Sequence, residues 1–286
     1  MTRANASPLI EPGDILAAGP ERFRFVDGSW FLGEPGKGEV AYRQEHIPGA
    51  VHFPLDEVCD RSSDLPHMLP SPEAFAAWAG GKGLRADDAI VVYDVIGVRS
   101  AARTWWTLTV FGARNVKVLN GGLPAWKDAG GSTVSGDVLV QPTRFDASSP
   151  GDKVVSFAEM LDFSQRRPED APLTLDARST GRFEGREPEP REGLSSGHMP
   201  NSASLPFTDL LDGGRMKAPD DLRALFAAKG VDGVRPVVTT CGSGVTAAVL
   251  ALALVEAGFS LPRLYDGSWA EWASRAEAVI LKGPQS

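Results

Sequence analysis

The residues with the clearest chemical capability surround Cys241, one of only two cysteines in the chain. Cys241 follows a short apolar stretch at 236–240, and a long apolar segment at 245–258 begins after Gly242 and Gly244. This pattern predicts a strand that ends at the cysteine, a glycine turn and a helix. The N-terminus of a helix carries unpaired N–H groups and partial positive charge, which favour a thiolate, and glycines let loop N–H groups converge on an anion. We therefore interpret Cys241 as a nucleophile, with a buried structural cysteine as the alternative.

Composition bounds the class of protein. Apolar residues make up 42% and charged residues 23% of 286 residues, as in globular proteins with one large domain or two ordinary ones. A net charge of −8 argues against nucleic acid or a membrane surface as partner, although local arginines still allow a small anionic substrate. Two cysteines form no disulfide framework, so we expect a reducing compartment and a cytoplasmic protein. Residues 1–8 lack a signal peptide's apolar core, and no window approaches the roughly 18 apolar residues of a membrane span.

Four sequence patterns recur in the same order in the two halves of the chain, which indicates an internal duplication. The third and fourth patterns are 26 residues apart in the first half (Asp94 to Asn120) and 25 apart in the second (Cys241 to Asp266). The patterns are a strand ending in Asp27 or Asp176, a His-x-Pro turn at His46 or His198, a strand–loop–helix at Asp94 or Cys241, and a glycine turn into tryptophan after Asn120 or Asp266. Because both halves have Asp27, His46 and their counterparts, we interpret these four residues as a structural network.

Short apolar strands alternate with helical segments, and strands that are apolar on both faces are typical of a parallel sheet covered by helices. We predict an α/β fold of two tandem domains, each a mostly parallel sheet flanked by helices. The predicted domains are residues 1–140 and 153–286, joined by a polar linker at about 141–152. Asp94 stands where the second half has Cys241, and a carboxylate cannot perform a thiol's chemistry. The first domain is therefore predicted to be catalytically inactive.

These motifs resemble the tandem-domain rhodanese family of thiosulfate and 3-mercaptopyruvate sulfurtransferases. The resemblance covers nearly the whole chain and implies two rhodanese-like domains. Members that favour 3-mercaptopyruvate read Cys-Gly-Ser-Gly at the nucleophile, as here, whereas members that favour thiosulfate carry basic residues in that loop. The motifs concerned are residues 26–30, 46–50, 120–126, 175–185 and 265–269.

The resemblance implies that Cys241 takes the sulfur of 3-mercaptopyruvate as a persulfide, releases pyruvate, and passes the sulfur to a thiol such as thioredoxin or glutathione, or to cyanide. Ser243 is implied to contact the substrate, with a simple turn residue as the alternative. The sequence has no metal-ligand cluster, phosphate-binding loop or dinucleotide motif, so we expect no metal and no cofactor beyond the persulfide. The loop N–H groups expected to hold the sulfur anion are those of Gly242, Ser243, Gly244, Val245 and Thr246.

The resemblance assigns the substrate carboxylate to two arginines outside the loop, Arg182 in a Gly-Arg-Phe motif and Arg191 in a Pro-Glu-Pro-Arg motif. The planar fork of arginine suits a carboxylate. Because the segment at 182–192 is rich in Glu and Arg, the alternative for each is a solvated surface charge.

Release of pyruvate needs a proton, and the resemblance implies Asp56 and His67 of the first domain for this task. Asp60 and Asp64 compete with Asp56, and the alternative for His67 is a loop histidine packed on the other domain. We interpret Cys59 as an incidental small residue, with a redox role as the alternative.

The sequence leaves three alternative functions. The first is the same fold acting mainly on thiosulfate, and the second is a persulfide carrier or interaction module charged by another protein. The third is a phosphatase of a related fold, which requires an arginine six positions after the cysteine, where this chain has Ala247.

Overall fold

The computed structural model describes residues 7–284, so most of the N-terminal stretch considered above lies outside the described residues. The chain forms two compact units. The first comprises the chain up to Ser62, Leu69–Gly151 and Leu211–Met216, and the second comprises Ser63–Met68, Asp152–Leu210 and the chain from Lys217 onward. Each unit thus includes one short segment from the half of the sequence that builds the other. No helix among the described residues is long and apolar enough to cross a membrane.

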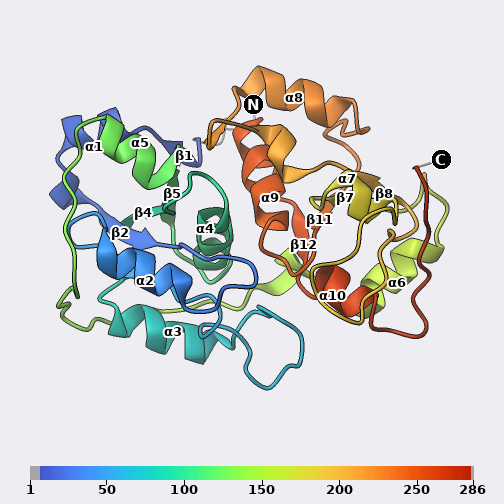
Figure 1. Ribbon diagram of the computed structural model, residues 1–286, viewed down its shortest axis with the longest axis horizontal. Helices are drawn as coiled ribbons and strands as arrows, with labels where there is room; N and C mark the ends of the chain where they lie inside the picture. Colours follow the sequence, from blue (N-terminus) through green and yellow to red (C-terminus); the bar gives the residue numbers. More distant parts are fainter. Residues whose placement is uncertain (1–6, 285–286) are drawn as a thin grey trace. The chain divides into compact units, whose positions relative to one another are not determined.

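The first unit is built on a five-stranded sheet with the order β1-β5-β4-β2-β3, in which all neighbours are parallel (Figure 1). The two central residues Val91 and Val92 of β4 point to opposite faces and are both buried, which is typical of a strand covered by helices on both sides. The strands are β1 (Leu9–Ile10), β2 (Arg24–Asp27), β3 (Val51–His52), β4 (Ala89–Tyr93) and β5 (Asn115–Leu119).

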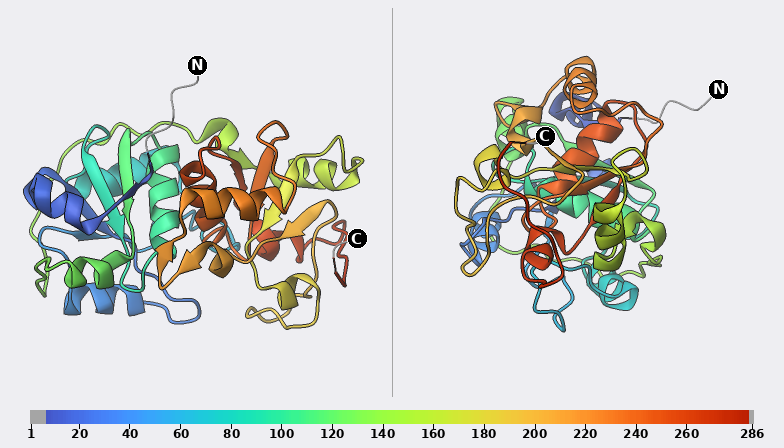
Figure 2. Two further views of the ribbon diagram at one scale, coloured as in Figure 1. Left: turned by 90° about the horizontal axis from the view of Figure 1, so that it is seen from above. Right: turned by 90° about the vertical axis from the view of Figure 1, so that its right-hand side faces the viewer.

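Helices cover both faces of this sheet (Figure 2). On one face, Ile15, Tyr42 and Trp126 from three helices form one buried cluster with Phe25 and Val91 of the strands. The helices of the first unit are α1 (Pro12–Ala18), α2 (Lys37–Gln44), α3 (Pro72–Gly81), α4 (Ser100–Val110) and α5 (Gly122–Asp128), with a 3-10 turn at Pro20–Arg22.

The second unit repeats this sheet with the order β6-β12-β11-β7-β8, again parallel throughout. Its core includes Met160, Val238, Trp269 and Trp272. The strands are β6 (Val154–Val155), β7 (Leu173–Asp176), β8 (Ser202–Ser204), β11 (Val237–Thr240) and β12 (Arg263–Tyr265). The helices are α6 (Phe157–Gln165), α7 (Thr180–Phe183), α8 (Pro219–Ala227), α9 (Ala247–Glu256) and α10 (Ser268–Trp272), with a 3-10 turn at Phe207–Leu210 and another at Gly151–Lys153.

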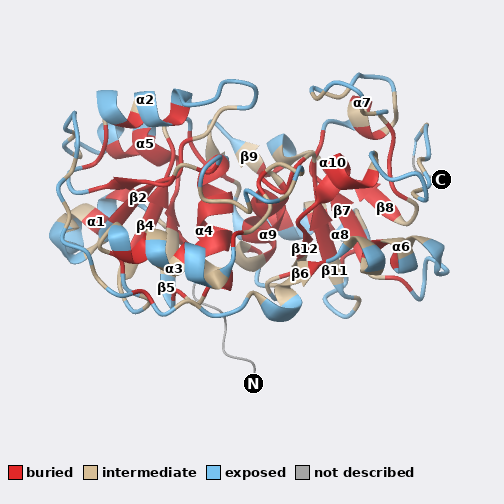
Figure 3. Cartoon of the chain, turned by 90° about the horizontal axis from the view of Figure 1, so that it is seen from below, coloured by how far each residue is buried: buried red, intermediate tan, exposed pale blue. Residues whose placement is uncertain are grey.

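The helix after the cysteine loop is apolar on every side. Every residue of α9 from Ala247 to Leu254 is buried, and α4, its counterpart in the first unit, is buried along nearly its whole length (Figure 3). A helix that is hydrophobic all round belongs in a protein interior. The prediction of a helix in this segment is confirmed, and it begins at Ala247 rather than at Val245.

One of the two exchanged segments, Leu211–Met216, is a hairpin, and most of the expected linker has no regular secondary structure. A two-stranded antiparallel hairpin, β9 (Leu211–Asp212) and β10 (Arg215–Met216), belongs to the first unit, where the Met216 N–H donates to Oδ1 of Asn120 at 2.9 Å. The segment 141–150 contains no helix or strand. It packs on the first unit, because the Thr143 N–H donates to the Gly80 carbonyl at 2.8 Å and the Phe145 ring meets Phe75 edge-on. The predicted class, an α/β fold of two similar parallel-sheet units flanked by helices, is confirmed.

Candidate active site around Cys241

The main chain at Cys241 is fixed by the start of α10. The Cys241 N–H donates to the hydroxyl oxygen of Ser268 at 3.3 Å, and the Cys241 carbonyl accepts from the Trp269 N–H at 2.9 Å. The Gly242 carbonyl accepts from the Ala270 N–H at 3.0 Å. Cys241 itself is 2% exposed. The carboxyl end of the central strand β11 thus carries a buried thiol in a loop whose first two carbonyl groups are already bonded.

Several N–H groups of the loop are available for an anion. Gly244 has a φ of 79°, a left-handed conformation that glycine adopts without strain. Within residues 7–284, the N–H groups of Gly242, Ser243, Val245 and Thr246 donate no hydrogen bond. Since α9 begins directly afterwards, these groups combine with the positive end of a ten-residue helix. The loop is built to hold negative charge.

The first unit has a loop equivalent to the Cys241 loop, with a carboxylate in place of the thiol. Asp27 pairs with Tyr93 in one sheet and Asp176 pairs with Thr240 in the other, so the next residues, Asp94 and Cys241, are structurally equivalent. The predicted alignment of these two residues is therefore confirmed.

The buried Asp94 carboxylate accepts hydrogen bonds from the N–H groups of Ile96, Arg99 and Ala101 at 3.0–3.1 Å. Burial raises the pKa of Asp94 from 3.8 to about 6, although these three N–H groups lower it. The residues of the second unit that correspond to Ile96 and Arg99 are Ser243 and Thr246. The first unit thus fills its own anion site, and the second leaves the corresponding N–H groups open.

Both predicted carboxylate-binding arginines lie beside the cysteine loop. A Cβ atom built on Gly242 would lie 3.0 Å from Nη2 of Arg182 and 3.8 Å from Nη1 of Arg191. The loop itself, residues 241–246, contains no Lys or Arg. Two guanidinium groups therefore reach the loop from a different segment and lie against the open side of Gly242.

Sequence reasoning missed two residues of this site, Arg178 and Glu189. The buried Arg178 guanidinium pairs with Asp176 and with Oε1 of Glu189, each at 2.7 Å, and its Cζ lies 4.0 Å from the ring centre of Trp269. Glu189 Oε2 accepts from Nε and Nη2 of Arg182, at 3.1 and 2.5 Å. The one sequence feature that singles out Glu189 is its place between two prolines, two residues before Arg191.

His67 also belongs to the second unit, in the segment Ser63–Met68. Its Nδ1 lies 3.1 Å from the Ser243 hydroxyl oxygen, and the residue is buried. Asp56 is part of the first unit, where it is exposed and accepts a 2.8 Å hydrogen bond from Nε1 of Trp30. The structure thus brings five predicted side chains or loop positions together in one unit, those of Cys241, Gly242, Ser243, Arg182 and Arg191, with His67 beside them.

The other cysteine has a different environment. The Cys59 thiol is half-buried and donates to the Asp56 carbonyl at 3.3 Å. Burial, together with the charge of Asp56, raises the pKa of the Cys59 thiol, so little thiolate forms there at neutral pH.

The two histidines of the repeated His-x-Pro turns occupy matching structural positions. His46 Nδ1 lies 2.8 Å from the Tyr42 carbonyl oxygen, and His198 Nδ1 lies 3.0 Å from the Phe183 carbonyl oxygen. Each histidine also forms an isolated β-bridge, with Val134 and Leu281 respectively. Their contacts are those of a shared scaffold.

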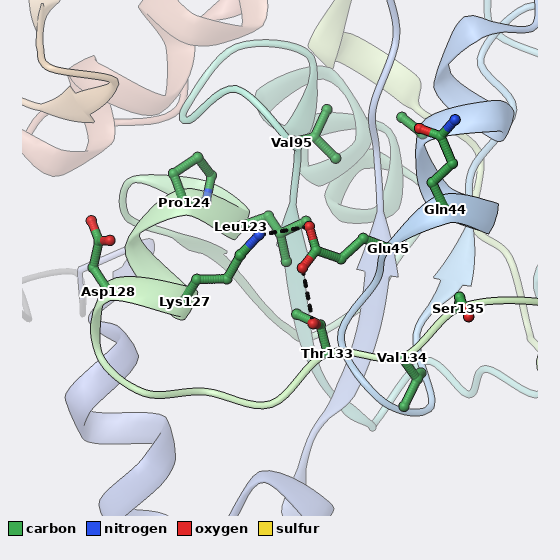
Figure 4. A pocket seen from close by; sticks show the side chains of 11 residues that line it. Gln44, Glu45, Val95, Leu123, Pro124, Lys127, Asp128, Thr133, Val134 and Ser135 are labelled. Atoms are coloured by element: carbon green, nitrogen blue, oxygen red, sulfur yellow. Dashed lines mark hydrogen bonds and ion pairs between the residues drawn. The ribbon is translucent and has the colours of Figure 1, made fainter.

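A cavity of about 840 Å³ lies in the first unit, next to Val95 of the Asp94 loop. Three of its polar side chains are paired with one another: Glu45 accepts from Lys127 at 2.7 Å and from Thr133 at 3.0 Å (Figure 4). These bonds lower the pKa of Glu45. Because Glu45 and Lys127 compensate each other's charge and no cysteine lines the cavity, it does not compete with the Cys241 loop as the site of thiol chemistry.

Comparison with known proteins agrees with this geometry. Residues 36–129 and 159–275 each match the family described as "Rhodanese-like domain". The chain is 40% identical over 266 residues to human 3-mercaptopyruvate sulfurtransferase, covering 91% of this chain and 89% of that protein. It is 37% identical over 257 residues to thiosulfate sulfurtransferase of Bos taurus, covering 88% and 86%. The crystal structure of SseA from Escherichia coli, described with the 3-mercaptopyruvate sulfotransferases, superposes with a TM-score of 0.82 at 34% identity, covering 92% of this chain and 99% of that one.

Proposed function

The chain belongs to the rhodanese family, and on that premise we propose that this sulfurtransferase takes its sulfur from 3-mercaptopyruvate through a persulfide on Cys241. One observation carries the choice of donor: Arg182 and Arg191 lie beside Gly242, while the loop itself has no basic residue. A carboxylate separated from the reacting sulfur by a methylene and a carbonyl group needs cations at the side of the loop, whereas a sulfonate attached directly to that sulfur needs them within it.

The reaction consists of two transfers. In the first, the Cys241 thiolate attacks the thiol sulfur of 3-mercaptopyruvate, an S–S bond forms, and the C–S bond breaks. The bonding electron pair leaves with the carbon as pyruvate enolate, which then takes up a proton. In the second, an acceptor thiolate or cyanide attacks the outer sulfur, and the Cys241 thiolate is regenerated. Covalent catalysis of this kind divides one difficult step into two easier ones, and it requires no cofactor.

The surrounding groups have distinct roles in this proposal. Arg182 and Arg191 hold the substrate carboxylate, and the loop N–H groups from Gly242 to Thr246 stabilise the thiolate and the persulfide anion. His67 and the Ser243 hydroxyl, 3.1 Å apart, deliver the proton that the enolate needs. Asp56 is proposed to support the same proton transfer.

The experiment is to incubate the purified protein with 3-mercaptopyruvate and a thiol and to follow pyruvate release. We expect release by the wild type, none by Cys241→Ser, and unchanged release by Cys59→Ser, which is the matched control. Mass spectrometry of the wild type treated with donor alone should find one added sulfur atom on the peptide that contains Cys241. Pyruvate release by Cys241→Ser would overturn the assignment.

Thiosulfate is the second candidate donor, favoured by the open N–H groups of the loop and by the name of the bovine relative. A kcat/KM higher for thiosulfate than for 3-mercaptopyruvate would make it the main donor. We further propose a cytoplasmic location and a thiol acceptor of the thioredoxin or glutathione class. If the persulfide formed only when a desulfurase was added, the protein would instead be a sulfur carrier.

A further inference from the structure

A buried carboxylate stands directly behind the arginine that reaches the cysteine loop. The Glu189 side chain is 3% exposed, and its two oxygens are divided between two arginines: Oε1 accepts from Arg178 at 2.7 Å and Oε2 from Arg182 at 2.5 Å. Arg178 in turn pairs with the buried Asp176 at 2.7 Å. Two carboxylates and two guanidinium groups thus form one linked set, whose formal charges sum to zero.

This arrangement controls what Arg182 presents to the loop. Its Nε and Nη2 are both bonded to Glu189, and within the described part of the chain Nη1 has no hydrogen-bond partner. Arg182 therefore keeps a fixed orientation with Nη2 toward Gly242, and its Nη1 remains available to a substrate while its charge is compensated. Because Glu189 is almost fully buried, solvent screens its charge only weakly at the nearby loop.

We infer that Glu189 is a positioning and specificity-determining residue, which orients Arg182 and compensates its charge beside the Cys241 loop, so that a monoanionic donor is favoured over a dianionic one. The inference rests on the proposed function. 3-Mercaptopyruvate carries one negative charge and thiosulfate carries two. An uncompensated positive charge a few ångströms from the bound donor attracts the dianion more strongly, which at the effective dielectric constant of a protein surface corresponds to a selectivity change of about tenfold or more.

The test is Glu189→Gln, which keeps the shape of the side chain and removes its charge. The measurement is kcat/KM for 3-mercaptopyruvate and for thiosulfate. We expect the ratio of the two to shift about tenfold toward thiosulfate, with the change mainly in KM. The matched control is Glu192→Gln, which removes the same charge from an exposed position three residues away and should keep the wild-type ratio.

A second variant separates charge from shape. Glu189→Asp keeps the charge with a shorter side chain, so both kcat/KM values are expected to fall together at an unchanged ratio. A wild-type ratio in Glu189→Gln, or a shifted ratio in Glu189→Asp, would overturn the inference. The donor ratio of Glu189→Asp tests the inference even if Glu189→Gln does not fold. If instead the wild type forms no persulfide from 3-mercaptopyruvate, the proposed function fails rather than the role of Glu189.

Discussion

The Nδ1 atom of His67 lies 3.1 Å from the hydroxyl oxygen of Ser243. His67 has a φ of 60°, a left-handed conformation that costs a non-glycine residue about 1 kcal/mol or more and persists only where the surroundings enforce it. The ring is buried, so its orientation toward the loop is fixed before any substrate arrives.

Ser243→Ala should separate the two sulfur donors. Without the hydroxyl, the proton from His67 reaches the enolate less efficiently, so we expect kcat for 3-mercaptopyruvate to fall by about ten- to a hundredfold. With thiosulfate the leaving group is sulfite, which needs no proton on carbon. The kcat for thiosulfate should therefore remain near the wild-type value. Steady-state kinetics with both donors tests this, and an equal loss for both would indicate a merely structural hydroxyl.

Arg182→Lys should weaken capture of the carboxylate while keeping the positive charge. A lysine cannot bond Glu189 with two nitrogens and still present a third donor to the substrate. We expect KM for 3-mercaptopyruvate to rise about tenfold with a smaller change in kcat. Arg186→Lys, four residues further along and 65% exposed, is the control and should leave KM unchanged. A larger effect of the control than of Arg182→Lys would contradict this role.

Arg178→Met should destabilise the second unit strongly. Burial opposes the charge of Arg178, but Asp176 and Glu189 raise the pKa of its guanidinium above the ordinary value. Removing it leaves the buried Asp176 carboxylate without its guanidinium partner and Glu189 with Arg182 alone, at a cost of about 3–5 kcal/mol in the free energy of unfolding.

The measurement for Arg178→Met is urea-induced unfolding, with Arg166→Met as the control. Arg166 pairs with Asp162 on the surface, where such a pair contributes about 1 kcal/mol or less. Similar losses in the two variants would mean that the linked set of charges contributes nothing beyond a surface ion pair.

The buried Asp94 carboxylate makes stability depend on pH in an unusual direction. Its pKa is about 6 in the folded chain and 3.8 ordinarily, so between these values the folded state binds more protons than the unfolded state. The free energy of unfolding attributable to this group therefore falls as pH rises from about 4 to about 6. In Asp94→Asn this contribution disappears, so the difference between wild type and variant should change by about 3 kcal/mol across that window.

Urea unfolding of both proteins at several pH values between about 4 and about 7 measures this difference. Asp87→Asn, an exposed acid in the same unit, is the control and should run parallel to the wild type. A constant difference between wild type and Asp94→Asn would contradict the protonation of a buried carboxylate.

Much of the fold was predictable because the same sequence patterns occur in both halves of the chain. Strands apolar on both faces, together with a repeated aspartate at one strand end, led to the equivalence of Asp94 and Cys241, which the register of the two sheets confirms. The helix α3 runs over Pro72–Gly81, and its start is marked locally by proline at the first position and by the Ser71 side-chain cap.

The rest depends on contacts that local patterns do not encode. Glu189 bonds Arg178, eleven residues earlier in the chain, only because the loop between them folds back, and no periodicity predicts such a return. His67 contacts Ser243, which is 176 residues away in the sequence. The residues next to His67 in the sequence contain no pattern that assigns it to the second unit. Sequence patterns predicted the elements, whereas the exchanged segments follow from tertiary packing.

The exchange of short segments between the two units limits how the duplicated chain can be divided. A polypeptide cut between Gly151 and Asp152 would separate His67 from the loop it contacts, and it would leave the β9–β10 hairpin in the fragment without Asn120. Neither half of the sequence therefore contains every segment of its own structural unit. The two repeats are consequently not interchangeable modules, and each half of the chain needs a short segment of the other to complete its unit.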